Sequence, residues 1–409
     1  MKIVVTEAMP TQSGDASTTE ANIPQVVLIT GAKSQLAEAL LRVAADIGEL
    51  ALNTITNTST KTNTKTNTNT NTNISVNAVV PLKLYALSRS QLDITDAANI
   101  SAVFAQYRPS WVINCAAYNA VDAAEHDAIE ANRVNALGPE LLARQCLLSG
   151  ARLLHVSSDY VFGGHAVCEI ANAAERVVGD ARESGVEQHQ NPDSASNSNP
   201  NPNSNPNPNQ VHLPRAFVEL DAPEPLSAYG TSKLLGEQRV VAVLGDCATI
   251  VRTSWLYGQD GHNFVKTMLN LMRTQPSLQV IADQIGCPTW SDALAKVIWQ
   301  LVVQQYSGVF HYSAQGQCSW YEFACEIQRQ AIALHLLSQP VVIQPITSAD
   351  YANQALNRGI SLAKRPSYSV LNSGKLRSTL VTHNALLMPE LIEWQDWRQQ
   401  LNRMLRRLS

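Results

Sequence analysis

The sequence predicts an α/β fold in which a doubly wound parallel sheet of the Rossmann-like kind is joined to a smaller α/β substrate-binding cap domain. Two observations predict it. Over the first half of the chain, short apolar runs rich in β-branched residues alternate with amphipathic helical stretches, which is the order that builds a parallel sheet. The first of these runs passes through a glycine turn into a helix, which presents the helix N-terminal amides to a phosphate group.

Composition limits the functions that the chain can have. With 409 residues, of which 45% are hydrophobic and 16% charged, the chain can bury a substantial core. A net charge of −4 gives no electrostatic reason to expect nucleic acid or a membrane as partner, and it favours a small-molecule substrate. The seven cysteines include no C-x-x-C pair, so neither a disulfide framework nor a metal site is expected. No apolar run suits a signal peptide or a membrane span, and we expect a cytoplasmic protein.

Three stretches of low complexity divide the chain. Residues 1–24 are expected to form a flexible extension, and tracts near 53–78 and 165–214 are expected to be surface insertions, because they offer no apolar face to bury. The remainder has the length of one enzyme with two domains. We predict a dinucleotide-binding domain over 25–250 and a mainly substrate-binding domain over 251–409, with some segments of the latter free to return to the first domain.

The first predicted strand, Val26–Ile29, leads into a turn and then a helix with one apolar stripe, made of Leu36, Leu40, Val43 and Ile47. Dinucleotide folds place glycine at this turn, at the approach to the pyrophosphate and at the helix–strand contact. Here only Gly31 is glycine, and the other two positions hold Ser34 and Ala37. We therefore expect a cofactor to bind, but more weakly than to a loop with three glycines.

Three further strands are predicted at residues 81–87, 111–117 and 152–156, with helical stretches between them. Asp96 can cap the helix that follows the first of these strands, and Pro109 ends that helix. With the strand at Val26, this order gives the alternation of strands and helices that forms a doubly wound parallel sheet.

The residues after the second strand of this sheet predict the cofactor. A dinucleotide fold that uses NAD carries an acidic residue there, which binds the 2′-hydroxyl of the adenosine ribose. This chain has Ser88 followed by Arg89, and a guanidinium can instead bind a 2′-phosphate. We therefore expect NADPH as the cofactor, with NADH as the alternative.

Two later segments carry groups suited to carbonyl chemistry. Tyr229 and Lys233 lie four residues apart at the start of a predicted helix and share one face of it. The ammonium is expected to lower the pKa of the phenol and to make Tyr229 a proton donor for a reduction. Ser158 follows the fourth strand, at the end of the sheet where such folds bind ligands. Trp255 follows another strand and could stack on a sugar, whereas later aromatics such as Trp320 are expected in the core.

Together, Ser158, Tyr229 and Lys233 resemble the catalytic trio of the extended short-chain dehydrogenases/reductases. Within that superfamily the chain is similar to the dTDP-4-dehydrorhamnose reductase family, over nearly everything outside the extension and the two tracts. The motifs that carry this resemblance are L-D-I-T-D at 92–96, N-C-A-A-Y-N-A-V-D at 114–122, S-D-Y-V-F at 158–162, R-T-S-W at 252–255, D-Q-I-G-C-P-T at 283–289 and R-P at 365–366. The resemblance implies hydride transfer from a nicotinamide to C4 of dTDP-4-dehydro-L-rhamnose, which yields dTDP-L-rhamnose for cell-surface polysaccharide.

The resemblance also implies roles for single residues. Tyr229 would donate the proton, Lys233 would hold the nicotinamide ribose, and Ser158, where the family usually has threonine, would hydrogen-bond the carbonyl oxygen. Contacts with the substrate are implied for Val121, Ser158, Asp159 and Trp255. Besides Ser88, Arg89, Tyr229 and Lys233, the residues expected to contact the cofactor are Gly31, Ser34, Gln35, Leu36, Asp93, Ile94, Ala117, Tyr118 and Asn119. The resemblance leaves a need for Mg²⁺ open, and no ligand cluster indicates one.

Other interpretations stay open at this point. Nucleotide-sugar 4,6-dehydratases are similar in fold but carry a glutamate where this chain has Tyr160, so a reductase is favoured over a dehydratase or an epimerase. Another nucleotide-sugar reductase or epimerase stays an alternative. A non-catalytic regulatory subunit is another alternative, because a partner of eukaryotic methionine adenosyltransferase resembles the same family and the glycine loop is altered here. Besides a nucleotide-sugar substrate, the expected partner is a second copy of the chain in a homodimer.

Overall fold

A computed structural model describes residues 4–5, 25–47, 51–55, 77–163, 167–171, 211–382 and 394–409. Apart from Val4–Val5, the predicted extension lies outside these ranges, as do residues 56–76 of the first tract and 172–210 of the second. By their internal contacts, residues 166–216 form one unit and the rest of the chain forms another. In the smaller unit, β7 (Val167–Ala171) pairs antiparallel with β8 (Val211–Arg215).

The larger unit is built on one sheet of eight strands. Seven of them follow the order β1 (Val4–Val5), β4 (Asn77–Leu87), β2 (Gln25–Thr30), β5 (Trp111–Asn114), β6 (Arg152–Ser158), β9 (Thr249–Thr253) and β14 (Gly308–His311). These neighbours are parallel, whereas β3 (Ala51–Ile55) pairs antiparallel with β4. Because the chain builds outward from β2 in both directions, the predicted doubly wound parallel sheet is confirmed.

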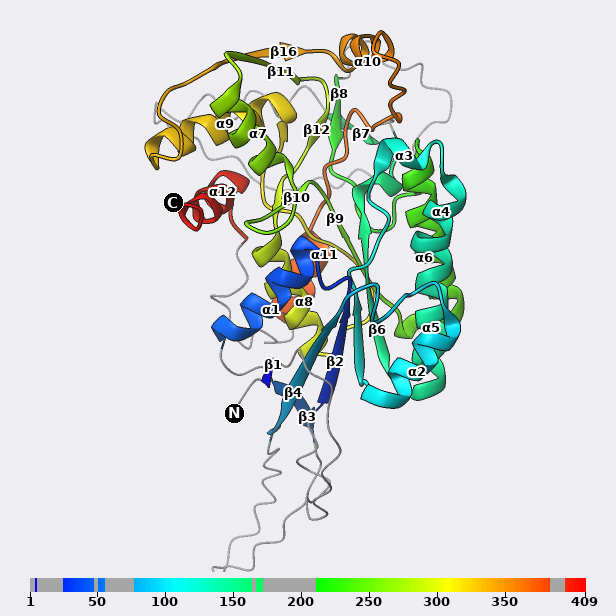
Figure 1. The fold of residues 1–409 in the computed structure, drawn as a ribbon. Coiled ribbons are helices and arrows are strands. Elements are labelled where there is room, and N and C mark those ends of the chain that lie inside the picture. The colour runs from blue at the N-terminus through cyan, green and yellow to red at the C-terminus, as the bar shows by residue number, and fades with distance from the viewer. Residues whose placement is uncertain are drawn as a thin grey trace, which may run out of the picture. The chain divides into compact units, whose positions relative to one another are not determined.

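Helices cover both faces of this sheet (Figure 1). One face carries α2 (Ala97–Tyr107), α5 (Gly138–Ser149) and α6 (Ala228–Leu244), and the other carries α1 (Gln35–Ile47), α8 (Ser291–Val303) and α11 (Gly374–Thr382). The apolar face of α1 explains why this helix packs on the sheet, because Leu36, Leu40 and Val43 are buried in the core between them. The short helices α3 (Val121–Ala124) and α4 (Ala128–Asn132) and a π-helical turn (Arg133–Leu137) lead to α5.

A smaller α/β layer comes from the C-terminal part of the chain. In it β11 (Ser277–Ile281) pairs in parallel with β16 (Val342–Ile346), and α7 (Phe264–Thr274) and α9 (Trp320–Ala333) pack on β11 (Figure 1). After β16 comes α10 (Ser348–Leu356), and α12 (Trp397–Arg406) packs on α9. Two short pairs of strands are also present. β10 (Leu256–Tyr257) pairs with β13 (Thr289–Trp290), and β12 (Ile285–Gly286) pairs with β15 (Cys318–Ser319).

Side-chain caps set where the helices next to the ligand end of the sheet begin. Asp96 accepts hydrogen bonds from the N–H groups of Ala98 and Asn99, as predicted for the start of α2. Ser227 accepts from the N–H of Gly230 at 3.1 Å and so caps α6. This cap places Tyr229 and Lys233 in the first two turns of α6, which confirms the predicted helix start.

Candidate active site

Two adjoining cavities lie at the carboxyl ends of the central strands, where the sequence predicts the ligands. The first has a volume of about 480 Å³ and the second of about 540 Å³. The residues that line both are Lys33, Ser34, Cys115, Ala117 and Asn119. Every residue predicted to act in catalysis or to contact cofactor or substrate lines one of the two cavities, although the role of each stays a prediction.

Gly31, at the end of β2, forms a wall of the first cavity. It has a φ of +68°, and a Cβ there would lie 3.0 Å from the backbone of Ala116, so both conformation and space require glycine. Beside it, the Thr30 hydroxyl donates to Asn114 Oδ1 at 2.6 Å and accepts from the N–H of Ala116 at 3.1 Å. These bonds join the glycine turn to the loop after β5, so bare backbone faces a ligand there.

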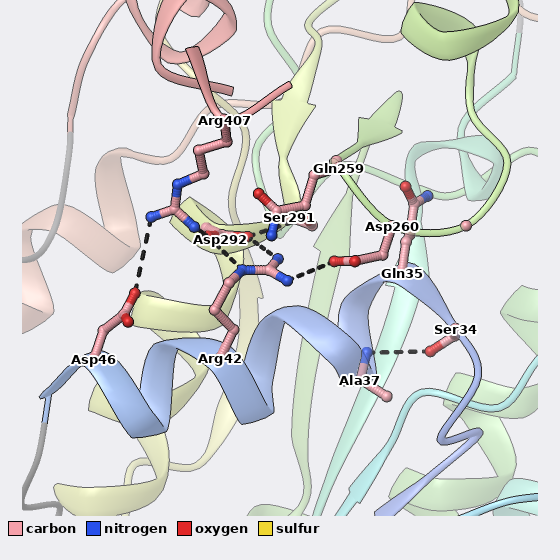
Figure 2. A network of polar contacts seen from close by, with 12 residues as sticks. Ser34, Gln35, Ala37, Arg42, Asp46, Gln259, Asp260, Ser291, Asp292 and Arg407 are labelled. Carbon is pink, nitrogen blue, oxygen red and sulfur yellow. Dashed lines mark hydrogen bonds and ion pairs between the residues drawn. The ribbon is translucent and has the colours of Figure 1, made fainter. Parts of the chain in front are cut away.

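Ser34 begins the turn that leads into α1. Its backbone does not have a positive φ, so a side chain is tolerated at this position. Its hydroxyl accepts from the N–H of Ala37 at 3.2 Å, as a helix cap does (Figure 2). Lys33, an exposed residue, lines both cavities beside this helix N-terminus. The turn therefore offers free amides and an ammonium to a diphosphate.

Ser88, Arg89 and Asp93 line the first cavity after β4. The guanidinium of Arg89, a side chain that is 67% exposed, lies 3.6 Å from Asp93 and 3.5 Å from Glu130. Thr95 donates to Asp93 through its N–H at 2.9 Å and its hydroxyl at 2.7 Å. Burial alone would raise the pKa of Asp93, but these hydrogen bonds hold it below its usual value. Asp93 is therefore an ionised acceptor that helps to orient Arg89.

The loop that carries Tyr118 and Asn119 is fixed by a residue that the sequence did not single out. Asn135, which is buried, accepts from the N–H of Tyr118 at 2.8 Å and donates to its carbonyl at 3.0 Å. It also donates to the hydroxyl of Ser232 on α6 at 2.9 Å. The sequence has no local signal for this role, because Asn135 lies 17 residues beyond Tyr118.

The second cavity brings Ser158, Tyr229 and Lys233 together. Ser158 ends β6, whereas Tyr229 and Lys233 come from α6, which packs against β6. Lys233 Nζ donates to the carbonyl of Val156 at 2.7 Å. All three catalytic candidates are buried, with exposed fractions of 9% or less. The wall of this cavity also contains the predicted contacts Gln35, Leu36, Val121, Asp159 and Trp255.

The predicted effect of Lys233 on Tyr229 is wrong in this structure. Burial raises the pKa of Tyr229 above its usual value, and the hydrogen bond with Ser158 offsets this only in part. The ammonium of Lys233 instead donates to the carbonyl of Val156, and burial lowers the pKa of Lys233 to about 8 against the opposing effect of Glu237. Tyr229 is therefore held in its protonated form, which is the form that a proton donor requires.

Asp159, predicted to contact the sugar, is buried beside Ser158. Its carboxylate accepts from the hydroxyl of Ser158 at 2.9 Å and from that of Ser369 at 2.7 Å. Burial raises the pKa of Asp159 to about 6, although both hydrogen bonds oppose the shift. The N–H of Tyr160 donates to Ser158 at 3.2 Å. Asp159 and Tyr160 together orient the serine hydroxyl.

Trp255 is less open than the sequence predicts. It has a φ of +45°, and its ring stacks on that of Trp320 with centroids 3.5 Å apart and planes 7° apart. Gly286 packs against the same indole, because a Cβ there would come within 2.4 Å of it. Trp320, which the sequence places in the core, packs against the core and also lines the cavity. A substrate would contact an indole pair rather than a single ring.

A group of three residues, Asp122, Tyr160 and Arg365, lies next to Tyr229. They belong to the motifs given above, but the sequence assigned them no contact with cofactor or substrate. Arg365 donates to Asp122 at 2.8 Å, and its positive charge opposes the rise in the pKa of Tyr160. The N–H of Ala363 donates to the other oxygen of Asp122 at 2.9 Å. Tyr160 packs edge-on against Tyr229, with ring centroids 5.5 Å apart, and burial raises the pKa of Tyr160 to about 12. Tyr160 is therefore neutral and is not available as a base.

Two further properties concern the described residues only. Within these ranges, no three His, Cys, Asp or Glu side chains are grouped so that they could hold a metal ion. In the same part of the chain, no helix has the length and apolar character that crossing a membrane requires.

Comparison with known proteins agrees with this arrangement. The family described as RmlD substrate binding domain matches residues 25–176 and 211–409. A dTDP-4-dehydrorhamnose reductase from Aggregatibacter actinomycetemcomitans is 32% identical over 326 residues, which cover 78% of this chain and 88% of the relative. A dTDP-4-keto-6-deoxy-D-glucose reductase from Streptomyces niveus is also 32% identical, over 73% of this chain and 82% of the relative.

A solved structure shows the same fold. The dTDP-4-dehydrorhamnose reductase from Bacillus anthracis, in complex with NADP, superimposes with a TM-score of 0.64 at 28% sequence identity. The match covers 94% of this chain and 100% of that chain. These matches confirm the resemblance that the motifs indicate. The chain belongs to the family described as RmlD substrate binding domain.

Proposed function

We propose that the chain reduces dTDP-4-dehydro-L-rhamnose at C4 with NADPH and yields dTDP-L-rhamnose. As a member of this family the chain is an oxidoreductase. Its cofactor, its sugar and the roles of its residues are the proposal. The observation that carries it is the convergence of Ser158, Tyr229 and Lys233 in a cavity that adjoins the one formed by Gly31.

The residues present fit a nicotinamide dinucleotide. The glycine turn at Gly31 lines the first cavity with backbone, and the start of α1 with Lys33 offers amides and a positive charge to a diphosphate. Arg89 would hold a 2′-phosphate, and Lys233 would hold the nicotinamide ribose. When bound, the nicotinamide supplies the hydride. The similarity to a reductase in complex with NADP supports this assignment.

The chain's own residues supply the proton and orient the carbonyl. Tyr229 is protonated because burial raises its pKa, and it gives its proton to the sugar oxygen as negative charge develops there. The hydroxyl of Ser158 donates to Asp159 in this structure, and it would turn its one proton to the same sugar oxygen when the substrate binds. Lys233, whose pKa burial lowers to about 8, is mostly charged at neutral pH and would hold the nicotinamide ribose.

The choice of sugar rests on the motifs. The relatives from Aggregatibacter actinomycetemcomitans and Streptomyces niveus are both 32% identical to the chain, and their names point to different dTDP-linked keto sugars. The resemblance in the motifs favours dTDP-4-dehydro-L-rhamnose. A dehydratase is disfavoured, because Tyr160 stands where an elimination needs a carboxylate base and the phenol is neutral.

The test is turnover by the purified full chain with NADPH and dTDP-4-dehydro-L-rhamnose, next to dTDP-4-keto-6-deoxy-D-glucose. Tyr229→Phe should lower kcat by about 100- to 10,000-fold and leave the NADPH Kd nearly unchanged, because it removes only the transferable proton. Tyr107→Phe, which removes a phenol at the end of α2 and outside both cavities, is the matched control and should behave as wild type.

Three outcomes would change the assignment. Turnover of the second sugar alone would replace the proposed substrate. Binding of NADPH without turnover of either sugar would favour the regulatory subunit. Near-wild-type kcat in Tyr229→Phe would exclude the phenol as proton donor.

A further inference from the structure

Arg42, on the outer side of α1, lies between two carboxylates from distant parts of the chain (Figure 2). Its Nε and Nη2 donate to the two oxygens of Asp292 at 3.1 and 2.6 Å, and its Nη1 donates to Asp260 at 2.6 Å. The Asp292 side chain is fully buried, whereas that of Asp260 is 29% exposed. One guanidinium therefore joins α1 to the start of α8 and to the loop before α7.

A second arginine completes the charge balance around Asp292. Arg407, just beyond the end of α12, donates to Asp292 Oδ2 at 2.5 Å and lies 3.8 Å from Asp46 of α1 (Figure 2). A buried carboxylate needs such partners, because its desolvation is otherwise costly. Arg42, Asp46, Asp260, Asp292 and Arg407 form what we call the arginine network.

Asp260 connects the arginine network to the wall of the second cavity. Asp260 belongs to the loop of residues 258–262, and the next residues, Gly261 and His262, line that cavity together with Ser34 and Gln35. A Cβ on Gly261 would lie 3.3 Å from that of Gln35, so the loop backbone packs closely on the first turn of α1. Gln35 also donates to the carbonyl of Leu256 at 3.1 Å.

The loop is thus held against α1 at two separate points. Gln35 packs against Gly261 on the side of the cavity, and Arg42 holds Asp260 two turns further along the same helix. Lys266 adds bonds to the carbonyls of Gln259 and Gly261 at 3.2 and 2.8 Å from the other side. Arg42 itself does not line either cavity, so any effect on ligands must act through the loop.

We propose that Arg42 and Asp260 are positioning residues for the cofactor: their ion pair sets the distance between the 258–262 loop and the phosphate-binding turn of α1. Asp292 and Arg407 fix the guanidinium of Arg42, so the position of this wall depends on the C-terminal end of the chain. This inference rests on the proposed function, because it requires that the turn at Ser34 receives the cofactor diphosphate. Loss of the ion pair weakens cofactor binding and leaves the proton transfer at Tyr229 unaffected.

The test removes the charge at the partly exposed end of the network and leaves the buried pair intact. Asp260→Asn should raise the NADPH Kd and KM by about three- to tenfold, the effect of losing one ordinary hydrogen bond, with kcat at saturating NADPH unchanged. Asp260→Glu should restore most of the affinity. Asp46→Asn removes a carboxylate from the opposite end of the same network, and its NADPH Kd should equal that of wild type.

A second measurement needs no cofactor. In the cofactor-free protein, hydrogen exchange of the amides of residues 259–262 should be faster in Asp260→Asn than in wild type and unchanged in Asp46→Asn. An unchanged Kd and unchanged exchange in Asp260→Asn would overturn the proposal, as would equal effects of the two variants. If wild type bound no NADPH, the proposed function would fail, and the exchange measurement would still decide whether Asp260 positions the loop.

Discussion

At the scale of single residues, we expect Ser34 to set how closely a diphosphate approaches α1. Its side chain occupies a position where the fold prefers glycine, yet its hydroxyl caps the helix through Ala37. Replacing a serine cap by glycine costs only a few tenths of a kcal/mol. The gain in room should therefore outweigh the lost cap.

We expect Ser34→Gly to bind NADPH up to about tenfold more tightly than wild type, which corresponds to about 1.4 kcal/mol. Titration of NADPH into both proteins measures the difference. Weaker binding by the glycine variant would instead identify the serine hydroxyl as a ligand of the phosphate.

Arg89 should decide between NADPH and NADH. Its guanidinium is held near the cavity by Asp93 and Glu130 at distances of 3.5 to 3.6 Å, which are long enough for a 2′-phosphate to compete. We expect Arg89→Ala to lower kcat/KM for NADPH by about tenfold and to leave that for NADH nearly unchanged. Steady-state kinetics with both cofactors measure this, with Arg144→Ala on the exposed side of α5 as control. An unchanged preference in Arg89→Ala would rule the contact out.

At the scale of elements, α6 carries Tyr229 and Lys233, the proposed catalytic pair, and lies close to its neighbours. A Cβ on Gly236 would come within 2.1 Å of the carbonyl oxygen of Asn135, and one on Gly230 within 2.2 Å of that of Tyr160. These approaches to backbone atoms bring Tyr229 beside Ser158 and hold the loop of Tyr118 on the helix. The two glycines are therefore packing residues rather than flexible points.

We predict that Gly236→Ala destabilises the protein by about 1 to 3 kcal/mol. Alanine favours a helix by up to about 1 kcal/mol over glycine, but a contact of 2.1 Å with a backbone oxygen forces a larger displacement. Urea unfolding measures the change. Thr231→Ala, at an exposed position of the same helix, should alter the stability by no more than about 0.5 kcal/mol. Equal stability of Gly236→Ala and wild type would show that α6 can move away without cost.

At the scale of the whole molecule, the C-terminal segment is joined to the sheet domain beside the active site. Arg365 and the N–H of Ala363 both bind Asp122 at the start of α3. Burial alone would raise the pKa of Asp122, but the hydrogen bonds from these two groups hold it below its usual value. The stabilisation is therefore present above the pKa of an unfolded aspartate, about 3.9, and is lost as the pH falls through the lower folded value.

Asp122→Asn should accordingly lower the free energy of unfolding at pH 7, by no more than about 1 kcal/mol because the pair is partly exposed. At pH 3 the difference from wild type should be smaller. Urea unfolding at both pH values measures it, and Asp246→Asn, at an exposed aspartate, is the control. A difference that does not depend on pH would contradict the ionic role of Asp122.

The sequence by itself determined the order of strands and helices, the position of α6 and the glycine turn at Gly31. It also identified Ser158, Tyr229 and Lys233, which the structure brings into one cavity. These features depend on residues within one strand, one turn or one helix. Periodicity, caps and the steric needs of glycine act over that range, so they can be read from neighbouring positions.

Only the tertiary structure decided the pKa of Tyr229, the place of Trp320 and the arginine network. The pKa of a phenol depends on its burial, which a spacing of four residues does not reveal. Trp320 belongs to a helix whose spacing predicts core packing, but the ring on which it stacks, Trp255, follows a strand far away in the sequence. Arg42 and Asp292 are 250 residues apart in the chain, and their contact exists only because α1 and α8 pack on the same face of the sheet. Burial and long-range charge pairing are properties of the packed molecule, so no local pattern encodes them.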